Sequence, residues 1–412
     1  MRLSARFILP LLLLAAAGWL LWGTWKLRPP DSVTLYSGPV SGSFHTYATR
    51  YLPELQVVSP DTTVTPENET LRIPSLVASA ADKQAIGFAA IRESRLDATN
   101  LRSAGVIDTQ PLFIFHRRSL GRNLSLAELS KHRLITPPSG SASALAADAL
   151  LELHGIGTSS LDITRKPLMQ AVEALRKGQV DAGFFMLAID NAIIADLARD
   201  PQIQLLNLPN AESIARHLEF LAPIKIPRGI FDVAGDLPAQ DVFLVGSQID
   251  VIVHRDLNPA VLHHLLTALD DTHRKSGLLA RRGTYPTFSD SAWPVHPKAR
   301  AHGRDGPSWM YERLTPWLAA VIDVHWPLML AIAGVGSLWG GIKNLMALLA
   351  TTRHTMAIMI LQQLMQRGHN QVKAYAALYT RLEALADALS AEDSAQKRAR
   401  KMLEQLRSSP KA

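Results

Sequence analysis

The strongest constraint on the fold is an alternation of apolar β-type runs with amphipathic helical stretches between residues 33 and 273. This alternation predicts an α/β fold with mostly parallel sheets. Ser125 followed by Glu128 predicts a capping box, and Asn258 before Pro259 predicts the start of the closing helix. The predicted strands are Val33–Tyr36, Lys83–Ile91, Gln110–Arg118, one that ends near Ile135–Thr136, one that follows the predicted helix stop at Gly178, and Val242–His254.

Two strand–turn–helix units, Ser37–Phe44 and Pro138–Ala144, carry Gly- and Ser-rich turns. Their separation of about a hundred residues predicts two lobes, each presenting a helix N-terminus to a shared cleft. A helix N-terminus offers free N–H groups and a partial positive charge, glycine permits close approach, and serine adds donors. The predicted anion cradle therefore contains Gly38, Ser41, Gly42 and Ser43 in one half and Ser139, Gly140, Ser141 and Ser143 in the other.

Apolar residues next to these turns complete the predicted cleft. Phe185 and Met186, at the end of a predicted strand, are expected to form an apolar wall, and Phe44 stands at the start of the first helix. Closure of the lobes around a solute would be a hinge motion. Each serine taken singly fits an N-cap without a ligand equally well.

Long apolar runs flank this region. Phe7–Trp25 follows Arg2 and Arg6, and Trp326–Ala350 begins with an uncharged stretch rich in glycine. Both runs are long enough to predict membrane spans, and the basic N-terminus places the intervening domain outside the cytoplasm. A cleaved signal peptide is the alternative for the first run, and a buried core helix for the second.

The predicted organisation has five parts in a bacterial inner-membrane protein, with the main domain periplasmic and the tail cytoplasmic. In the tail, a leucine stripe around Leu378, Leu382 and Leu385 and a second apolar face around Leu403 and Leu406 predict a helical hairpin. The parts are an anchor at 1–30, a two-lobed domain at 31–300, a linker at 301–325, a span at 326–350 and the hairpin at 351–412.

Composition and spacing argue against several function classes. A net charge of +7 over 412 residues, without a dense basic patch, argues against nucleic-acid binding. The absence of cysteine removes disulfides, thiolate catalysis and Cys-based zinc sites. His263–His264 and Asp270–His273 lie on one predicted helix and are interpreted as a solvated face, with no metal expected. Asn68–Thr70 matches a glycosylation acceptor, which we discount.

Several blocks, in order and spacing, resemble the TAXI family of solute-binding subunits of tripartite ATP-independent periplasmic (TRAP) transporters. They are "VTLYSGPVSGSFHTYA", "SLAELSKHRLITPPSGSASALAADALLELHGI", "AVEALRKGQVDAGFFM" and "VFLVGSQIDVIVHRDLNPAVLHHLLTAL". The resemblance covers about Val33 to Ala350 and extends to a membrane-tethered branch of the family. Pro39, Phe44–His45 and Pro137–Pro138 depart from the family pattern at the cleft.

The resemblance implies a two-lobed periplasmic binding fold of type II, a small organic anion as ligand and a TRAP-type permease as partner. Dicarboxylates or amino acids of the glutamate type are the ligands it suggests, and no cofactor is expected. The alternative from another class is a sensor or scaffold that reports ligand occupancy to a cytoplasmic partner through the tail. An enzyme ranks third, because "SGSAS" lacks the flanking glycines of a nucleophile elbow.

Overall fold

The computed structural model describes residues 22–366 except 93–95, 122–123 and 290, together with residues 377, 380, 381 and 384 of the tail. The chain divides into two compact units, residues 1–323 and 324–412. Most of the predicted N-terminal span and the predicted tail hairpin lie outside the described residues, so both remain predictions.

The first unit contains all the strands that the structure describes. They are β1 (Thr34–Ser37), β2 (Thr63–Pro66), β3 (Ala85–Ala89), β4 (Leu101–Arg117), β5 (Leu134–Thr136), β6 (Ile163–Arg165), β7 (Ala182–Met186), β8 (Ile203–Leu205), β9 (Ala222–Ile226) and β10 (Val242–His254).

The described helices alternate with these strands and then follow β10. They are α2 (Ser43–Val58), η1 (Thr70–Arg72), α3 (Ile73–Ala78), η2 (Arg118–Leu120), α4 (Leu126–Leu129), α5 (Ala142–Leu153), η3 (Thr158–Ser160), α6 (Leu168–Arg176), α7 (Ala192–Arg199), α8 (Ala211–His217), α9 (Pro259–His273), α10 (Pro297–Asp305), α11 (Trp309–Arg313) and α12 (Pro316–Gln366).

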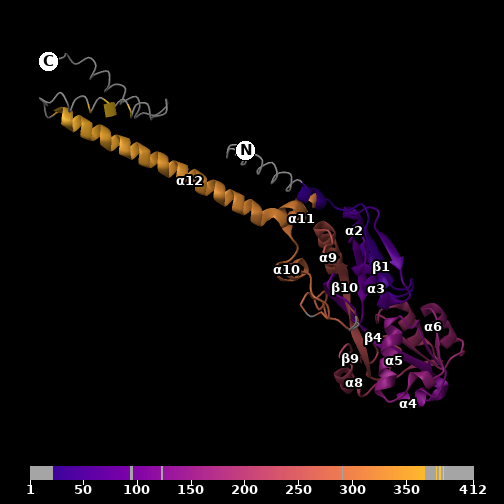
Figure 1. Ribbon diagram of the computed structural model, residues 1–412. Helices are drawn as coiled ribbons and strands as arrows, with labels where there is room; N and C mark the ends of the chain where they lie inside the picture. Colours follow the sequence, from indigo (N-terminus) through magenta and orange to yellow (C-terminus); the bar gives the residue numbers. More distant parts are fainter. Residues whose placement is uncertain are drawn as a thin grey trace. The chain divides into compact units, whose positions relative to one another are not determined.

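Two long antiparallel strands, β4 and β10, join the lobes (Figure 1). The first part of β4 pairs with β10, and its last part, from Leu112, pairs with β7 in the second lobe. Within each lobe the shorter strands are parallel, β2–β1–β3 in the first and β6–β5–β7 in the second. The sheets are therefore mixed rather than mostly parallel, because the connecting strands run against both sets.

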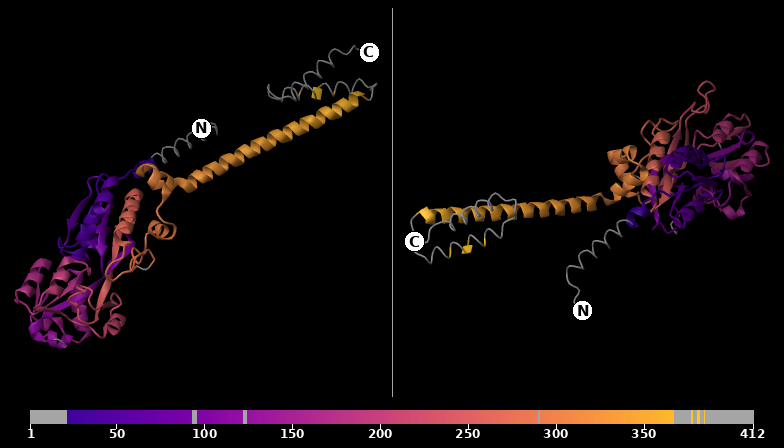
Figure 2. Two further views of the ribbon diagram at one scale, coloured as in Figure 1. Left: turned by 180° about the vertical axis from the view of Figure 1, so that it is seen from behind. Right: turned by 90° about the horizontal axis from the view of Figure 1, so that it is seen from above.

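Apolar clusters fill the space between sheet and helices in each lobe. In the first lobe α2 and α9 lie side by side over the sheet (Figure 2) and share a core that includes Tyr51, Phe88 and Leu265, all fully buried. In the second lobe Phe184 and Phe185, successive residues of β7, enter two different clusters on opposite faces of the sheet.

Local signals in the sequence set several helix ends. The capping box is confirmed: Ser125 Oγ accepts from the Glu128 N–H, and the Glu128 carboxylate accepts from the Ser125 N–H. Asn258 caps α9 by accepting from the Ala260 N–H at 2.9 Å. Gly178, with φ of 69°, follows the end of α6 as predicted, since glycine adopts this left-handed conformation without strain.

The region after the two-lobed domain is helical. Residues 301–325, predicted as a linker, form most of α10, then α11 and the start of α12. Tyr311, Ala319 and Ala320 pack into the core of the first lobe, which explains why this stretch is ordered. The run Trp326–Ala350 lies within α12, yet no helix among the described residues combines the length and apolarity needed to cross a membrane.

Candidate functional site

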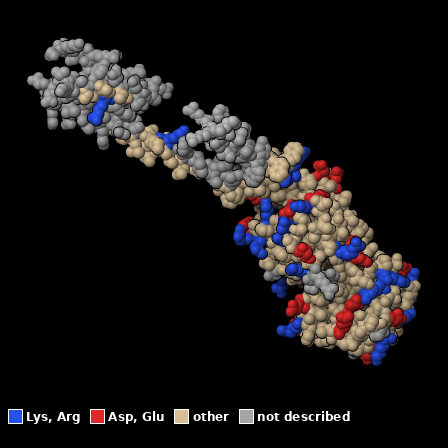
Figure 3. Space-filling view, viewed as in Figure 1, with Lys and Arg blue, Asp and Glu red and all other residues tan. Residues whose placement is uncertain are grey.

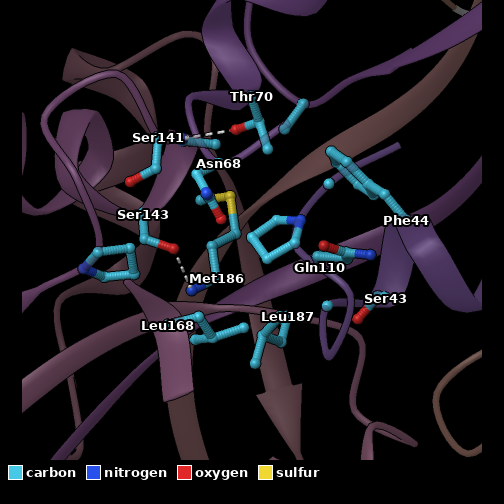
Figure 4. A pocket seen from close by; sticks show the side chains of 16 residues that line it. Ser43, Phe44, Asn68, Thr70, Gln110, Ser141, Ser143, Leu168, Met186 and Leu187 are labelled. Atoms are coloured by element: carbon cyan, nitrogen blue, oxygen red, sulfur yellow. Dashed lines mark hydrogen bonds between the residues drawn. The ribbon is translucent and has the colours of Figure 1, made fainter. Parts of the chain in front are cut away.

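A cavity lies where the two Gly/Ser turns meet. Its volume is about 50 Å³, which is room for a few water molecules or a small polar group with the lobes in this arrangement. In Figure 4, Ser141 and Ser143 stand on one side of the cavity, with Gln110, Ser43 and Phe44 on the other. None of the described residues that line it carries a charged side chain.

The N-terminus of α2 forms one wall. Its N-cap, Gly42, has no side chain to cap the helix, and Gly42, Ser43 and Phe44 all line the cavity. The backbone N–H groups of Ser43, Phe44 and His45 have no acceptor among the described residues. A helix of this length therefore presents three open donors and a partial positive charge to the cavity.

The N-terminus of α5 forms the facing wall, and most of its donors are already engaged. Ser141 is the N-cap and accepts from the Ala144 N–H at 3.2 Å. The Ala142 N–H donates to the hydroxyl of Thr70, a residue of the other lobe, also at 3.2 Å. Only the Ser143 N–H lacks a partner among the described residues of this first turn. The two helix ends therefore differ: α2 is open and α5 is largely capped.

Gln110, on β4, supplies a buried polar group. Gln110 is 2% exposed and lines the cavity, and its Nε2 forms no hydrogen bond of good geometry with a described residue, although it lies near enough to the Asp108 carboxylate to favour the charged form of that acid. A buried amide without a well-placed partner is costly, so in a native structure it calls for a water or ligand atom as acceptor. Gln110 therefore offers a further donor to a ligand oxygen.

Asp108 stands behind this wall, two residues before Gln110 on the same strand. Tyr47 donates to its carboxylate at 2.8 Å, and so does the Thr109 N–H. Burial raises the pKa of Asp108 to about 7, an effect that these hydrogen bonds oppose and the charge of Asp190 reinforces. Near neutral pH Asp108 is therefore close to half protonated. It lies near the cavity but does not line it.

Hydrogen bonds join the two lobes around the cavity. The Ala188 N–H donates to Ser43 Oγ at 2.9 Å, and the Leu71 N–H donates to the Gly140 carbonyl at 2.9 Å. Asn191 Nδ2 donates to the Ser41 carbonyl at 3.2 Å. Together with the bond from Ala142 to Thr70, these contacts hold the two lobes in a closed arrangement.

Most of the predicted site residues come together here, although not all of them face the cavity. Ser41 and Gly140 contribute carbonyls to the bonds between lobes, and Ser139 is exposed. Phe185 is fully buried in the core instead of forming a wall, because it and Met186 are successive strand residues that point to opposite faces. The predicted residues that line the cavity are Gly38, Gly42, Ser43, Phe44, Ser141, Ser143 and Met186.

Other lining residues were not predicted. Asn68 and Thr70, matched above to a glycosylation acceptor, lie at the cavity instead, and Leu168 and Leu187 extend its apolar part. Gln110 was predicted only as the first residue of a strand. These residues come from four separate segments, and no local signal in one sequence shows that such segments meet.

The histidines and acids of α9 are not the solvated face that we predicted. The Asp270 carboxylate accepts from His302 Nε2 at 3.0 Å, His264 contacts Glu54 at 2.8 Å, and His273 contacts Tyr51. Packing of α9 against α2 and α10 covers most of them in part, whereas Asp271 stays exposed. Among the described residues, no three His, Asp or Glu side chains form a metal-binding group. On the face seen in Figure 3, charges of both signs are interspersed over the domain.

Comparisons with known proteins address the central domain. Residues 76–278 match the sequence profile of the NMT1-like family. No curated protein sequence matches this chain. The predicted two-lobed α/β fold of the type II periplasmic binding-protein kind is confirmed.

Solved structures of two-lobed binding domains are distantly similar. An ancestral arginine-binding protein bound to arginine is 14% identical, with 58% of this chain and 92% of that chain covered and a TM-score of 0.38. The substrate-binding protein of an amino acid ABC transporter is 11% identical over 58% and 92%, with a TM-score of 0.37. The BenM effector-binding domain with benzoate is 8% identical over 58% and 90%, with a TM-score of 0.38.

Proposed function

We propose that this protein is a solute receptor that binds a small organic carboxylate in the cavity between its lobes. The observation that carries the proposal is the convergence of unpaired donors: three N–H groups at the start of α2 and the buried Nε2 of Gln110. A carboxylate placed there would satisfy donors that are otherwise left without partners. The apolar body of the ligand would lie against Leu168, Met186 and Leu187.

The charge of the cavity narrows the ligand class. An open helix N-terminus supplies roughly half a positive charge and the largely capped α5 adds less, so α2 and α5 together balance at most about one negative charge. No described lining residue is a carboxylate that could pair with an ammonium group, and none is a cation that could balance a second anion. A monocarboxylate with a short apolar body therefore fits better than the dicarboxylate or glutamate-type ligand that the family resemblance suggests.

Calorimetric titration with three ligands of the same carbon-chain length tests the proposal. Pentanoate, glutarate and glutamate differ only by a second carboxylate and an ammonium group, and pentanamide serves as the uncharged control. We expect pentanoate to bind most tightly and pentanamide not to bind. If glutamate binds more tightly than pentanoate, the proposed ligand class is wrong but the receptor function still stands. If none of them binds and mass spectrometry finds no co-purifying carboxylate, the receptor function is wrong.

The resemblance to TAXI receptors extends the proposal to location and partner. The domain would lie outside the cytoplasmic membrane, held by residues 1–30 and 326–350, and deliver its ligand to a TRAP-type permease. A periplasm-active reporter should then work when fused at Asp305 and fail when fused at Ala412. Activity at both positions would exclude the arrangement with two spans.

A ligand sensor is the second candidate. It is favoured by the contacts that the domain makes with the first turns of α12: Asp323 pairs with Lys298, and Tyr311 donates to the same carboxylate at 3.1 Å. Hydrogen exchange in residues 373–389 that changes upon ligand addition would support a sensor. Unchanged exchange, together with loss of solute uptake on deletion of the gene, would support the receptor.

A further inference from the structure

Exposed tryptophans and cations form a surface outside the ligand site. They come from the beginning and the end of the domain's sequence. We call it the base surface and define it as Trp22, Trp25, Lys26, Arg28, Pro29 and Trp317. Trp25 is 69% exposed, Trp22 58% and Trp317 44%. A groove runs between Trp25, Arg28, Pro29 and Trp317. Large aromatic side chains exposed together mark an interaction site rather than an ordinary solvated face.

The domain holds this surface in place. The indole N–H of Trp317 donates to the Thr24 carbonyl at 3.0 Å and so joins the first turn of α12 to the N-terminal segment. Asn258, at the start of α9, donates to the carbonyls of Leu27 and Arg28. Leu27 itself packs on the core of the first lobe. The aromatic and cationic groups are therefore fixed to the folded domain and do not belong to a loose tether.

The chemistry of the base surface matches lipid headgroups. Lys26 Nζ lies 3.6 Å from the centre of the Trp22 ring, and the Arg28 guanidinium lies 5.8 Å from that of Trp25. Neither cation pairs with a carboxylate among the described residues, and no acidic residue lines the groove. Indole rings favour the membrane–water interface, where one edge is wet and the other dry, and nearby cations attract anionic lipids.

The course of the chain favours a bilayer over a protein partner. The apolar run Phe7–Trp25 enters the described structure at Trp22, within the base surface, and a second apolar run starts at Trp326, shortly after Trp317. The hydrogen bond from Trp317 to Thr24 holds the end of the first apolar run next to the helical turn that precedes the second run. Apolar runs that adjoin the base surface in the sequence on both sides fit a bilayer better than a protein partner.

We propose that the base surface lies in the headgroup layer of a bilayer containing anionic lipid, so that the domain sits on the membrane in one fixed orientation. This contact is interfacial and does not depend on the identity of the solute. It differs from tethering alone, in which the domain would be free to turn above the bilayer.

Site-directed labelling of the full chain tests the proposal, because the natural sequence has no cysteine. A spin label at Leu318→Cys, beside Trp317, should be shielded from a water-soluble relaxation agent in nanodiscs of phosphatidylethanolamine and phosphatidylglycerol. The matched control is Phe243→Cys: Phe243 is 42% exposed, Leu318 is 41% exposed, and Phe243 is not part of the base surface. The control label should remain fully accessible to water.

Two further variants separate docking from tethering. With the label at Leu318→Cys, the double substitution Trp25→Ser and Trp317→Ser should abolish most of the shielding while the protein stays in the nanodisc. Lys26→Gln with Arg28→Gln should reduce shielding in anionic but not in phosphatidylcholine nanodiscs. Shielding that survives removal of both tryptophans would show that the tether alone places the label there and would overturn the proposal. The proposal would also be overturned if the label at Leu318→Cys were fully accessible to the water-soluble agent while the base surface carries no substitution.

Discussion

The backbone N–H of Ala142 and the hydroxyl of Thr70 form a hydrogen bond across the ligand cavity, 3.2 Å long. Ala142 opens α5 in the second lobe, whereas Thr70 opens η1 in the first. The Thr70 oxygen thus occupies one donor of the α5 N-terminus, much as a ligand oxygen would occupy the open donors of α2 in our proposal. The same bond therefore holds the lobes together and sets how much of the α5 terminus is available to a solute.

Thr70→Val removes this oxygen while keeping the shape of the side chain. We expect the free energy of unfolding to fall by about 1 kcal/mol, because the Ala142 N–H loses its partner inside a partly buried cavity. Urea denaturation measures this change. Thr49→Val is the control, since the Thr49 hydroxyl is exposed and bonds only within its own helix. Equal losses in both variants would show that the bond between the lobes contributes nothing.

Gly140 tests how closely the lobes approach. A Cβ added there would lie 2.8 Å from Glu69 Cβ, so one lobe must move away from the other. Gly140→Ala should weaken the bond from the Leu71 N–H to the Gly140 carbonyl and lower solute affinity without unfolding either lobe. Gly157→Ala is the control, because a Cβ there meets nothing within 4 Å. Small-angle scattering should show a more open domain for Gly140→Ala only, and identical scattering of both variants would contradict this expectation.

Ser141→Asp places a fixed negative charge at the cavity. Aspartate is as good an N-cap as serine, so α5 should persist and the fold should hold. We expect carboxylate affinity to fall by about a hundredfold or more, because like charges would be brought together out of water. Ser141→Asn keeps the cap without the charge and should bind nearly as well as the natural protein. Equal affinities for the two variants would place the carboxylate elsewhere.

The sequence predicted the parts of this site that depend on local chemistry. Gly42 before Ser43 and Ser141 before Ala142 mark helix starts that any reader of turns and caps would find. The error at Phe185 was also avoidable, because two successive strand residues cannot line the same cavity. The α/β class and the positions of β1, β3, β5, β7 and β10 followed from the spacing of apolar residues along the chain.

Other features depend on distant pairing and could not be predicted. The first half of β4 contains Gly105, with φ of 147°, and polar residues, so it does not look like a strand until β10 is set beside it. Thr70 and Gln110 belong to the site only because their segments fold against α5 and α2. Register and contacts between lobes arise from tertiary packing, on which a single sequence carries little direct information.

Asp108 gives the domain a pH dependence whose sign follows from its environment. Burial raises its pKa in the folded protein to about 7, from the ordinary value of 3.8. Between these two values the folded state holds a proton that the unfolded state has released. Stability from this group is therefore full below about pH 4, declines as the pH rises, and is lost once it passes about 7.

Asp108→Asn should flatten this decline. The slope attributable to the group is at most about 1.4 kcal/mol per pH unit. Urea denaturation at several pH values between 4 and 8 measures it, with Glu152→Gln, on the exposed side of α5, as the control. Burial also raises the pKa of Asp250, to about 6, so the loss of stability that Asp250 causes is complete near pH 6. Above pH 6 the remaining loss of stability therefore reports on Asp108. A variant that keeps the natural slope between pH 6 and 7 would show that Asp108 is ionised in the folded protein.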